Sequence, residues 1–491
     1  MKTNHTKIEE IFDYIKEING NSPDITTRII KIKNNRVGYI FLQSVSSDDK
    51  ISNFLVRSLT LNYQFNTINL FTKIFDSLQN SISNSNLKII NSKEEIFYYL
   101  SCGFTVILTD DSPKFIVVET RIKLDRGIVE SSTETIIRGP KDSFTENHLI
   151  NMGLIRKRIK DSNLWFDEVK IGRRTQTKVN IIYLKDIVNL EKIKKIRKKL
   201  ETIDIDGIID SGYIREFITG KKIFLFPKLL STERPDIVCS SLLEGKIVIL
   251  VENSPFVLII PTVFVDFLHS PEDNYQLPIN ASLSRIIRFL SFIITIITPA
   301  FYIAMMTYDI RLIPSELLIS LAAQRQGVPF PTAFEVILLL TIFEILRESD
   351  LRSPSKMGAS ISIVGALVLG DAAVSAGIVS PIAVIIVAIT SVSGLVFSDI
   401  DMVNSIRIWR IIFLIFASFL GFIGIVAAGI IFITRLASIE TLGTPYLAPL
   451  SPFNLKDQIY GIFKASRPNT VIRPNYLHLK NKKRENKNEK N

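Results

Sequence analysis

Residues 357–398 read MGASISIVGALVLGDAAVSAGIVSPIAVIIVAITSVSGLVFS, and in these 42 residues Asp371 is the only charged one. A hydrocarbon core of about 30 Å needs roughly 20 helical residues. A straight helix of this length would reach roughly 60 Å, which is twice that thickness. We therefore expect a hairpin of two membrane spans, at about 358–379 and 381–397, with its break in the GIVSP motif.

Two further apolar tracts flank this hairpin. Residues 289–308 contain 20 uncharged residues and residues 411–434 contain 24. Each tract is long enough to span a membrane once. The 47% content of hydrophobic residues is high for a soluble protein, and the excess is concentrated in residues 285–437. We predict that this region is a polytopic α-helical transmembrane domain.

Residues 332–346 form a weaker candidate span. Glu335 and Glu344 interrupt the tract and lie about 180° apart on a helix, so no apolar face avoids both. The segment is a span buried among other helices, a re-entrant helix or an interfacial helix. If this segment crosses the membrane, the chain has five spans, with the basic loops on the cytosolic side and the basic tail on the outer side. If it does not cross, the tail is on the cytosolic side and the basic loops are on the outer side. The sequence leaves this choice open.

The part of the chain before residue 285 contains an internal repeat. GFTVILTDDSPKFIVV, from Gly103, matches GKIVILVENSPFVLII, from Gly245, and VGYIFLQS (37–44) matches VNIIYLKD (179–186), both at an offset of 142. Their short, turn-bounded apolar runs are typical of buried strands. We predict an α+β membrane protein in which a duplicated cytosolic α/β domain precedes the helical domain. The predicted parts are an N-terminal extension (1–30), subdomain 1 (31–137), a basic helical linker (138–174), subdomain 2 (175–284), the transmembrane domain (285–437) and a basic C-terminal tail (438–491).

Basic residues are clustered in this chain, whose net charge is +11. Such clusters attract anionic lipid headgroups, and nucleic acid is not expected as a partner because no aromatic-interleaved motif accompanies them. In the linker, Arg156, Lys157 and Arg158 fall in the last turns of a predicted helix, where they complement its dipole. They are candidates for a lipid or subunit contact, with a solvated charged face as the alternative. No secretory signal leads the chain, so we expect the α/β domain to be cytosolic.

Motifs for catalysis are missing from the sequence. It has no phosphate loop, zinc-protease helix or nucleophile elbow, and its two cysteines suggest neither a disulfide framework nor a metal cluster. Asp204, Asp206 and Asp210 in IDIDGIIDSG are too few for a metal loop and favour a loop that ends in a helix cap. We expect no enzymatic activity, no cofactor and no metal.

Several long motifs resemble, in order, the A subunit of bacterial spore germinant receptors. They are RGPKDSFTENHLINMGLIRKRIKD, IGRRTQTKV, IDIDGIIDSGYIREFI, TERPDIVCSSLLEGKIVILVENSPFVLIIPTVFVDFLHSPEDNY and QGVPFPTAFEVILLLTIFEILRESDLRSP. The likeness runs from about residue 37 to residue 453. One position departs from the family pattern, which has Gly-Gln-Ala-Ala-Val where this chain has GDAAV, with Asp371 in place of the amide.

The resemblance implies a place in the inner membrane of the dormant spore. The implied partners are membrane lipids, a transporter-like B subunit that senses the nutrient and a lipoprotein C subunit. The resemblance also implies a homo-oligomer, with a pentamer as its size, that acts as a ligand-gated cation channel and triggers germination. Composition and spacing do not show this, and they leave open a secondary transporter or a non-conducting scaffold subunit.

Asp371 is the centre of a predicted pore stripe. Ionisable residues at membrane depth usually face water or a partner. On one helix from about 358 to 379, Leu367, Asp371, Val374 and Ile378 share a stripe. Around a symmetric axis this stripe would form one carboxylate ring beside apolar rings that can gate. Interfacial water near the hairpin break and an ion pair with another helix are the alternatives.

Four charged residues are candidates for coupling a nutrient sensor to this pore. Glu316 lies in the first turn of the amphipathic segment PSELLISLAAQRQ. Glu335 and Glu344 interrupt the weak span, and Arg347 is spaced to pair with Glu344 at i, i+3.

Overall fold

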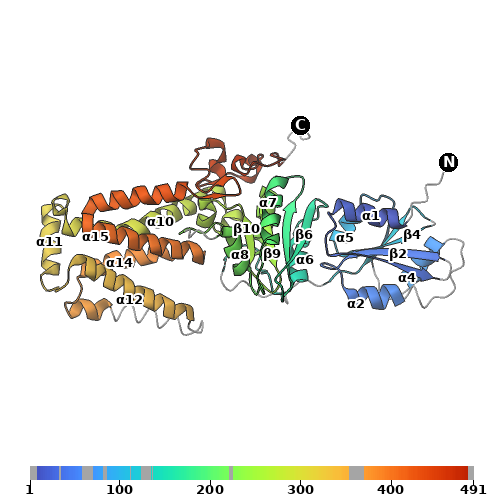
Figure 1. Ribbon diagram of the computed structural model, residues 1–491, viewed down its shortest axis with the longest axis horizontal. Coiled ribbons are helices and arrows are strands. Elements are labelled where there is room, and N and C mark those ends of the chain that lie inside the picture. Colours follow the sequence, from blue (N-terminus) through green and yellow to red (C-terminus); the bar gives the residue numbers. More distant parts are fainter. Residues whose placement is uncertain are drawn as a thin grey trace. The chain divides into compact units, whose positions relative to one another are not determined.

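The computed structural model describes residues 8–32, 35–57, 70–80, 86–110, 112–122, 134, 136–220, 225–352 and 370–484 (Figure 1). They form two compact units. The α/β unit comprises residues 1–222, 228–262 and 467–491, and the helical unit comprises residues 223–227 and 263–466.

Two antiparallel five-stranded sheets with the same strand order form the α/β unit. In the first sheet the order is β1 (Ile25–Ile32), β2 (Asn35–Leu42), β4 (Phe104–Thr109), β5 (Phe115–Glu119) and β3 (Leu87–Ile90). In the second the order is β6 (Leu164–Ile171), β7 (Thr177–Leu184), β9 (Ile247–Val251), β10 (Val257–Ile260) and β8 (Leu230–Thr232).

The register of the two sheets confirms the repeat. Val37 of β2 lies opposite Thr109 of β4, and Val179 of β7 lies opposite Val251 of β9. Both residues of the second pair lie 142 positions after those of the first. A slip by one residue would turn every buried side chain to the other face, so the duplicated apolar pattern fixes the same pairing twice. We call residues 8–122 the first copy and residues 148–260 the second copy.

Helices cover both faces of each sheet, which explains why the central strands β4 and β9 are buried along their whole length. In the first copy, α1 (Ile8–Ile18) and α5 (Ile96–Ser101) pack on one face, and η1 (Ile51–Val56) and α4 (Leu70–Asn80) pack on the other (Figure 1). In the second copy, α6 (His148–Arg158) and α9 (Pro235–Glu244) cover one face, and α7 (Leu190–Glu201) and α8 (Ser211–Thr219) contact β6 and β10.

The copies begin earlier than the sequence predicts. The predicted extension 1–30 contains α1, whose Ile8, Ile11 and Ile15 are buried on the first sheet. The predicted linker 138–174 contains strand β6, which completes the second sheet. The predicted tail is also divided, because Leu477 and Leu479 pack into the core of the second copy. The carboxylate-rich loop 203–210 ends as expected in a helix cap, since Asp210 accepts a hydrogen bond from the Gly212 N–H at 2.9 Å.

The described part of the helical unit contains five longer helices and the short helical stretch 370–375. The longer helices are α10 (Pro278–Thr307), α11 (Ser315–Arg325), α12 (Thr332–Arg352), α14 (Pro381–Gly394) and α15 (Ile400–Ala437). α10 and α15 are long and apolar enough to cross a membrane by length and composition. α10 contains the predicted span 289–308, and α12 contains the segment 332–346.

The predicted span 411–434 is not one continuous helix, because α15 folds back on itself at Gly421. The backbone there has φ 59° and ψ −136°, a conformation that favours glycine. The rings of Trp409 and Phe432 are 4.9 Å apart, although 23 residues of straight helix would separate them by about 34 Å. Residues 400–420 and 422–437 are therefore two antiparallel helices (Figure 1).

The helical unit thus has two distinct ends. At the turn end, a Cβ added to Gly421 would lie 2.9 Å from Tyr308, and one added to Gly377 would lie 3.5 Å from the Gly327 carbonyl oxygen, so these residues lie close together. At the arginine end, Glu344 of α12 meets Arg410 of α15. Trp409 and Phe432 are close to that end, so the chain leaves α15 at the end where α15 began.

Candidate functional site

The predicted pore stripe is only partly present. Leu367 lies outside the described residues, and the described helix ends at Ser375. Asp371 is exposed and Val374 is partly buried. The Ile378 N–H donates to the Ala373 carbonyl at 3.0 Å in a helix-ending turn with Gly377 at φ 67°. Ile378 is therefore beyond the helix, and the predicted stripe stops at Val374.

A buried carboxylate at the turn end ties three helices together. Glu335 lies in the first turn of α12, where the helix dipole favours a negative charge, and its side chain is fully buried. Its Oε1 accepts hydrogen bonds from the Ser380 hydroxyl, at 2.6 Å, and from the Ser380 backbone N–H. Arg325 of α11 lies 3.9 Å from its Oε2. Ser380 is also the N-cap of α14, so this carboxylate fixes the break that follows the Asp371 helix.

Sequence reasoning selected Glu335 but neither of its partners. Ser380 lies 45 residues later and Arg325 lies on another helix. No local spacing rule connects them. A serine directly before Pro381 was a visible sign of a helix start, but nothing in the sequence indicated which side chain its hydroxyl would bind.

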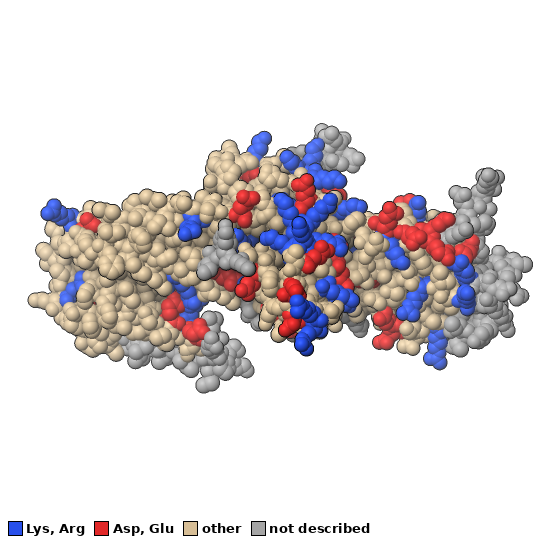
Figure 2. Space-filling model, viewed as in Figure 1, with Lys and Arg blue, Asp and Glu red and all other residues tan. Residues whose placement is uncertain are grey.

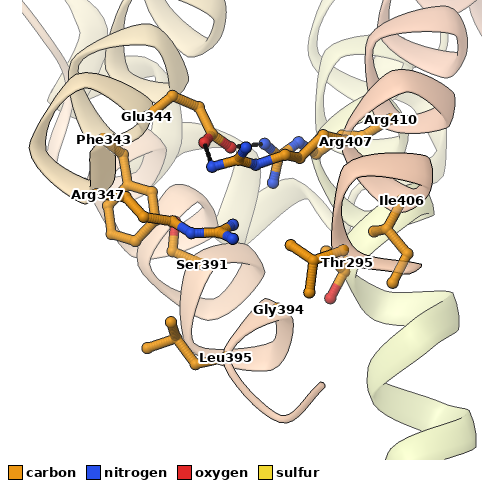
Figure 3. A pocket seen from close by; sticks show the side chains of 11 residues that line it. Thr295, Phe343, Glu344, Arg347, Ser391, Gly394, Leu395, Ile406, Arg407 and Arg410 are labelled. Atoms are coloured by element: carbon orange, nitrogen blue, oxygen red, sulfur yellow. Dashed lines mark hydrogen bonds and ion pairs between the residues drawn. The ribbon is translucent and has the colours of Figure 1, made fainter. Parts of the chain in front are cut away.

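A second charge cluster lies at the arginine end (Figure 3). Glu344 accepts a hydrogen bond from Arg410 at 2.6 Å and forms an ion pair with Arg407, both on α15. The predicted Glu344–Arg347 pair is not among the ion pairs of the described residues, because the carboxylate turns toward α15 instead. Figure 3 shows the Arg347 guanidinium apart from that carboxylate, beside Ser391 of α14. The enclosed space is about 10 Å³, which is at most one water molecule, so the cluster is a packed junction and not a ligand pocket.

A third cluster, which the sequence did not reveal, precedes the apolar part of α10. Asp273 is almost fully buried and accepts hydrogen bonds from Arg285 at 3.0 Å and Arg288 at 2.8 Å. Burial would raise the pKa of Asp273, but the two guanidinium groups hold it below its ordinary value. Nε2 of His269 lies 2.8 Å from the Gly461 carbonyl oxygen, and burial lowers the pKa of His269 to about 3. Arg285 of α10 also donates to the Gly461 carbonyl at 3.0 Å, so the cluster links residue 461 to the first turns of α10.

The remaining coupling candidate, Glu316, is exposed in the first turn of α11. In the described parts of the chain, no group of three or more His, Cys, Asp or Glu side chains could hold a metal ion.

The basic residues of α6 do not form one surface. Arg156 is 1% exposed, so it is available neither for the predicted lipid or subunit contact nor for a solvated face. Its guanidinium binds both oxygens of Asp24, at 2.7 and 2.8 Å, and so joins the second copy to the first. Arg158 is half-buried and pairs with Asp142 at 2.6 Å, whereas Lys157 lines a shallow surface cavity. The basic residues at the end of α6 complement the helix dipole, as the sequence predicts. The sequence did not indicate that Asp24, 132 residues before Arg156, would be the partner of that arginine.

Comparisons with known proteins agree on one family. The model of the Bacillus/Clostridium GerA spore germination proteins matches residues 13–476. Spore germination protein KA of Bacillus subtilis is 36% identical over 478 residues, which are 97% of this chain and 87% of that protein. Spore germination protein GerLA of Bacillus cereus is 33% identical over 96% of both chains. The crystal structure of the N-terminal domain of the A subunit of the Bacillus megaterium germinant receptor GerK3 covers 52% of this chain and 96% of its own, at 30% identity and a TM-score of 0.42.

Proposed function

The chain belongs to the GerA family of spore germination proteins, and on that premise we propose that it is the A subunit of a nutrient germinant receptor and forms a ligand-gated cation channel. The channel is a homo-oligomer, with five copies as the working number, in the spore inner membrane. It works with a nutrient-sensing B subunit and a lipoprotein C subunit, and the α/β unit faces the cytosolic core of the spore.

The charge distribution supports a membrane location for the helical unit. Figure 2 shows few charged side chains on the visible face of this unit and many on the α/β unit. The hairpin at Gly421 also supports a topology with both the basic loops and the basic tail on the inside. Arg347, Arg407 and Arg410 lie at the arginine end, and the chain leaves α15 toward the tail at that same end. All these basic residues can therefore be on the cytosolic side, as the positive-inside rule requires.

The exposure of Asp371 is the observation that carries the channel proposal. A carboxylate on the surface of an apolar helical unit needs water or a partner. Equivalent helices around a symmetry axis would provide water, and the exposed small residues Ala372, Ser375 and Ala376 would allow close packing there. The ring of Asp371 side chains then favours cations, and Val374, one turn further, narrows the path.

Flux measurements test the conducting role. Purified protein in liposomes should pass monovalent cations without a substrate gradient, and Asp371→Lys should reverse the preference for cations over anions. Asp350→Lys, which also converts an exposed carboxylate of the helical unit, is the matched control and should not reverse it. Saturable, coupled uptake would instead identify a secondary transporter, and absence of flux would identify a scaffold subunit.

Spores that carry Val374→Ala as their sole copy test the gate. A smaller side chain widens an apolar constriction, so we expect germination without nutrient. Normal dormancy would contradict the gate. Glu335→Gln should weaken the anchor of the turn after the Asp371 helix and give a smaller leak, whereas Glu316→Gln, on an exposed surface, should alter only the nutrient response if it couples to the sensor.

The proposed topology is testable by thiol labelling. Cys239 is buried and its pKa is raised to about 12, so Cys102→Ser leaves a background with little reactive thiol. A cysteine at exposed residue 451 should then react only from the cytosolic side. Labelling from the outer side would show that residues 400–437 cross an odd number of times.

A further inference from the structure

The two copies differ at the N-terminus of their first helix, which is α1 in the first copy and α6 in the second. In the first copy, Asp110 follows strand β4 and accepts a hydrogen bond from the Ile8 N–H of α1 at 3.2 Å. Arg36 of β2 forms an ion pair with Glu9 and lies 3.7 Å from Asp110. In the first copy, the N-terminus of α1 is therefore covered by side chains of the same copy.

The second copy carries the corresponding residues but leaves the equivalent place open. Lys178 and Glu252 lie 142 positions after Arg36 and Asp110. Glu252 accepts a hydrogen bond from the Lys178 backbone N–H at 3.0 Å, and the ion pairs among the described residues do not join these two side chains. A cavity of about 340 Å³ lies here, and the charged and buried polar residues that line it are Asp24 of the first copy with Glu146, His148, Glu168, Lys178 and Glu252.

His148 is the buried polar group of this cavity. Its side chain is 7% exposed, and neither ring nitrogen has a hydrogen-bond partner in the described parts of the chain. The Asn180 side chain lies close to the ring, and its amide oxygen also has no hydrogen-bond partner among the described residues. Burial lowers the pKa of His148, so the ring is neutral at pH 7 and has one nitrogen free to accept a hydrogen bond. A buried group without a partner is costly, which indicates that a ligand or water completes it.

Carboxylates outnumber cations around the cavity. Glu146, Glu168 and Glu252 line the cavity together with one cation, Lys178. Asp24 also lines it, but Arg156, Ser22 and Ser44 already bind its oxygens. The helix N-terminus, which would favour an anion, is capped by Asn147, whose side chain accepts from the Ile150 N–H at 3.2 Å. The charge left over is negative.

We propose that this cavity of the second copy binds a small aliphatic diamine or polyamine, with ammonium groups at Glu168 and Glu252 and one N–H donated to His148. The volume is within the roughly 300–1,000 Å³ range of small-molecule sites. Separated carboxylates suit several ammonium groups on a flexible chain. A metal ion does not fit, because the described residues contain no group of three ligating side chains close enough together. The site is separate from the proposed pore and does not depend on conduction.

Calorimetric titration of the full-length protein in detergent with putrescine and spermidine tests the site. Wild type should bind one ligand per chain. Glu168→Gln and His148→Phe should each weaken binding about tenfold or more, because each removes a buried or charge-assisted hydrogen bond. Asp110→Asn, at the equivalent position of the closed first copy, should bind like wild type. Magnesium chloride and glutarate are the comparison ligands.

Four results would overturn the proposal. They are no binding at millimolar polyamine, unchanged affinity in both cavity variants, an equal loss in Asp110→Asn, and magnesium or glutarate binding as tightly as the amines. Glu168→Gln keeps the shape of a partly exposed side chain, so it remains a test if His148→Phe fails to fold. Because the readout is binding alone, a failed flux experiment would leave this result intact.

Discussion

The two copies of the α/β unit share their apolar framework and differ in their polar ends. Strand order and register are the same, because a shift of one residue in the pairing would move each side chain to the opposite face of the sheet. The polar residues at the α1 and α6 N-termini have no such constraint. In the first copy they form ion pairs, whereas in the second they line a cavity. Duplication therefore preserved the fold and left one end free to change its chemistry.

The largest expected effect concerns the contact that joins the copies. In Arg156→Met, Asp24 is left buried without its cation, and loss of one partner of a buried pair costs about 3–5 kcal/mol. Arg158→Met, in the same helix turn, breaks a partly exposed pair with Asp142 and should cost about 1 kcal/mol or less. Urea unfolding followed by Trp165 fluorescence measures both, because the Trp165 Nε1–H donates to the Ile18 carbonyl of the first copy at 3.0 Å. A Trp409→Phe background isolates that signal.

The same contact has a defined pH dependence. Burial would raise the pKa of Asp24, but Arg156 and the two serines outweigh this and hold the pKa below its ordinary value. A lowered pKa in the folded state stabilises the protein fully above the unfolded value, about 3.9, and the stabilisation is lost as the pH falls through the folded value. The difference between wild type and Arg156→Met should therefore shrink in acid. An equal loss in Arg156→Met and Arg158→Met at pH 7 would show that the copies are not held by this pair.

A second, smaller effect compares Gly103 with Gly245, which occupy the same position in the two copies. Both have φ near 90°, so alanine costs each about 1–2 kcal/mol. A Cβ at residue 103 would lie 2.8 Å from the Val45 carbonyl oxygen, whereas one at 245 would meet the Leu479 side chain of the tail at 2.5 Å. Backbone cannot yield as a side chain can, so Gly103→Ala should lower the unfolding midpoint more.

Tryptic digestion sharpens this comparison. In Gly245→Ala the displaced Leu479 should loosen the tail, so cleavage near Lys480 should be faster than in wild type, whereas Gly103→Ala should leave the tail unchanged. If both variants lose the same stability and neither exposes the tail, the two copies have equivalent surroundings at this position.

The sequence could predict features that depend on local patterns, but not those that depend on contacts between residues far apart in the chain. The repeat was visible because central strands buried on both faces need apolar residues throughout. β6 was missed because the adjacent charges of Asp167 and Glu168 break the strict alternation of apolar and polar residues that indicates a strand. The fold-back at Gly421 was missed because a glycine within an apolar run interrupts no periodic pattern. The partners of Glu335 and Arg156 are tertiary contacts, which no local spacing can indicate.

The smallest expected effect separates the closed end from the open end directly. Asp110→Asn keeps an acceptor for the Ile8 N–H but loses its charge near the exposed Arg36, so it should lower the unfolding midpoint only slightly. Glu252→Gln keeps the hydrogen bond from the Lys178 N–H, and Glu252 forms no ion pair within the described parts of the chain. The substitution should therefore change the free energy of unfolding by no more than about 0.5 kcal/mol.

Salt distinguishes the cause of any difference between these two variants. At about 1 M salt, screening acts within roughly 3 Å, so the cost of Asp110→Asn should largely vanish while that of Glu252→Gln stays unchanged. Urea midpoints at low and high salt measure this. Equal, salt-sensitive losses in both variants would mean that Lys178 closes the second copy in solution as Arg36 closes the first. In that case the cavity beside His148 would be filled by the chain itself, and the difference between the copies would be one of side-chain position and not of binding capacity.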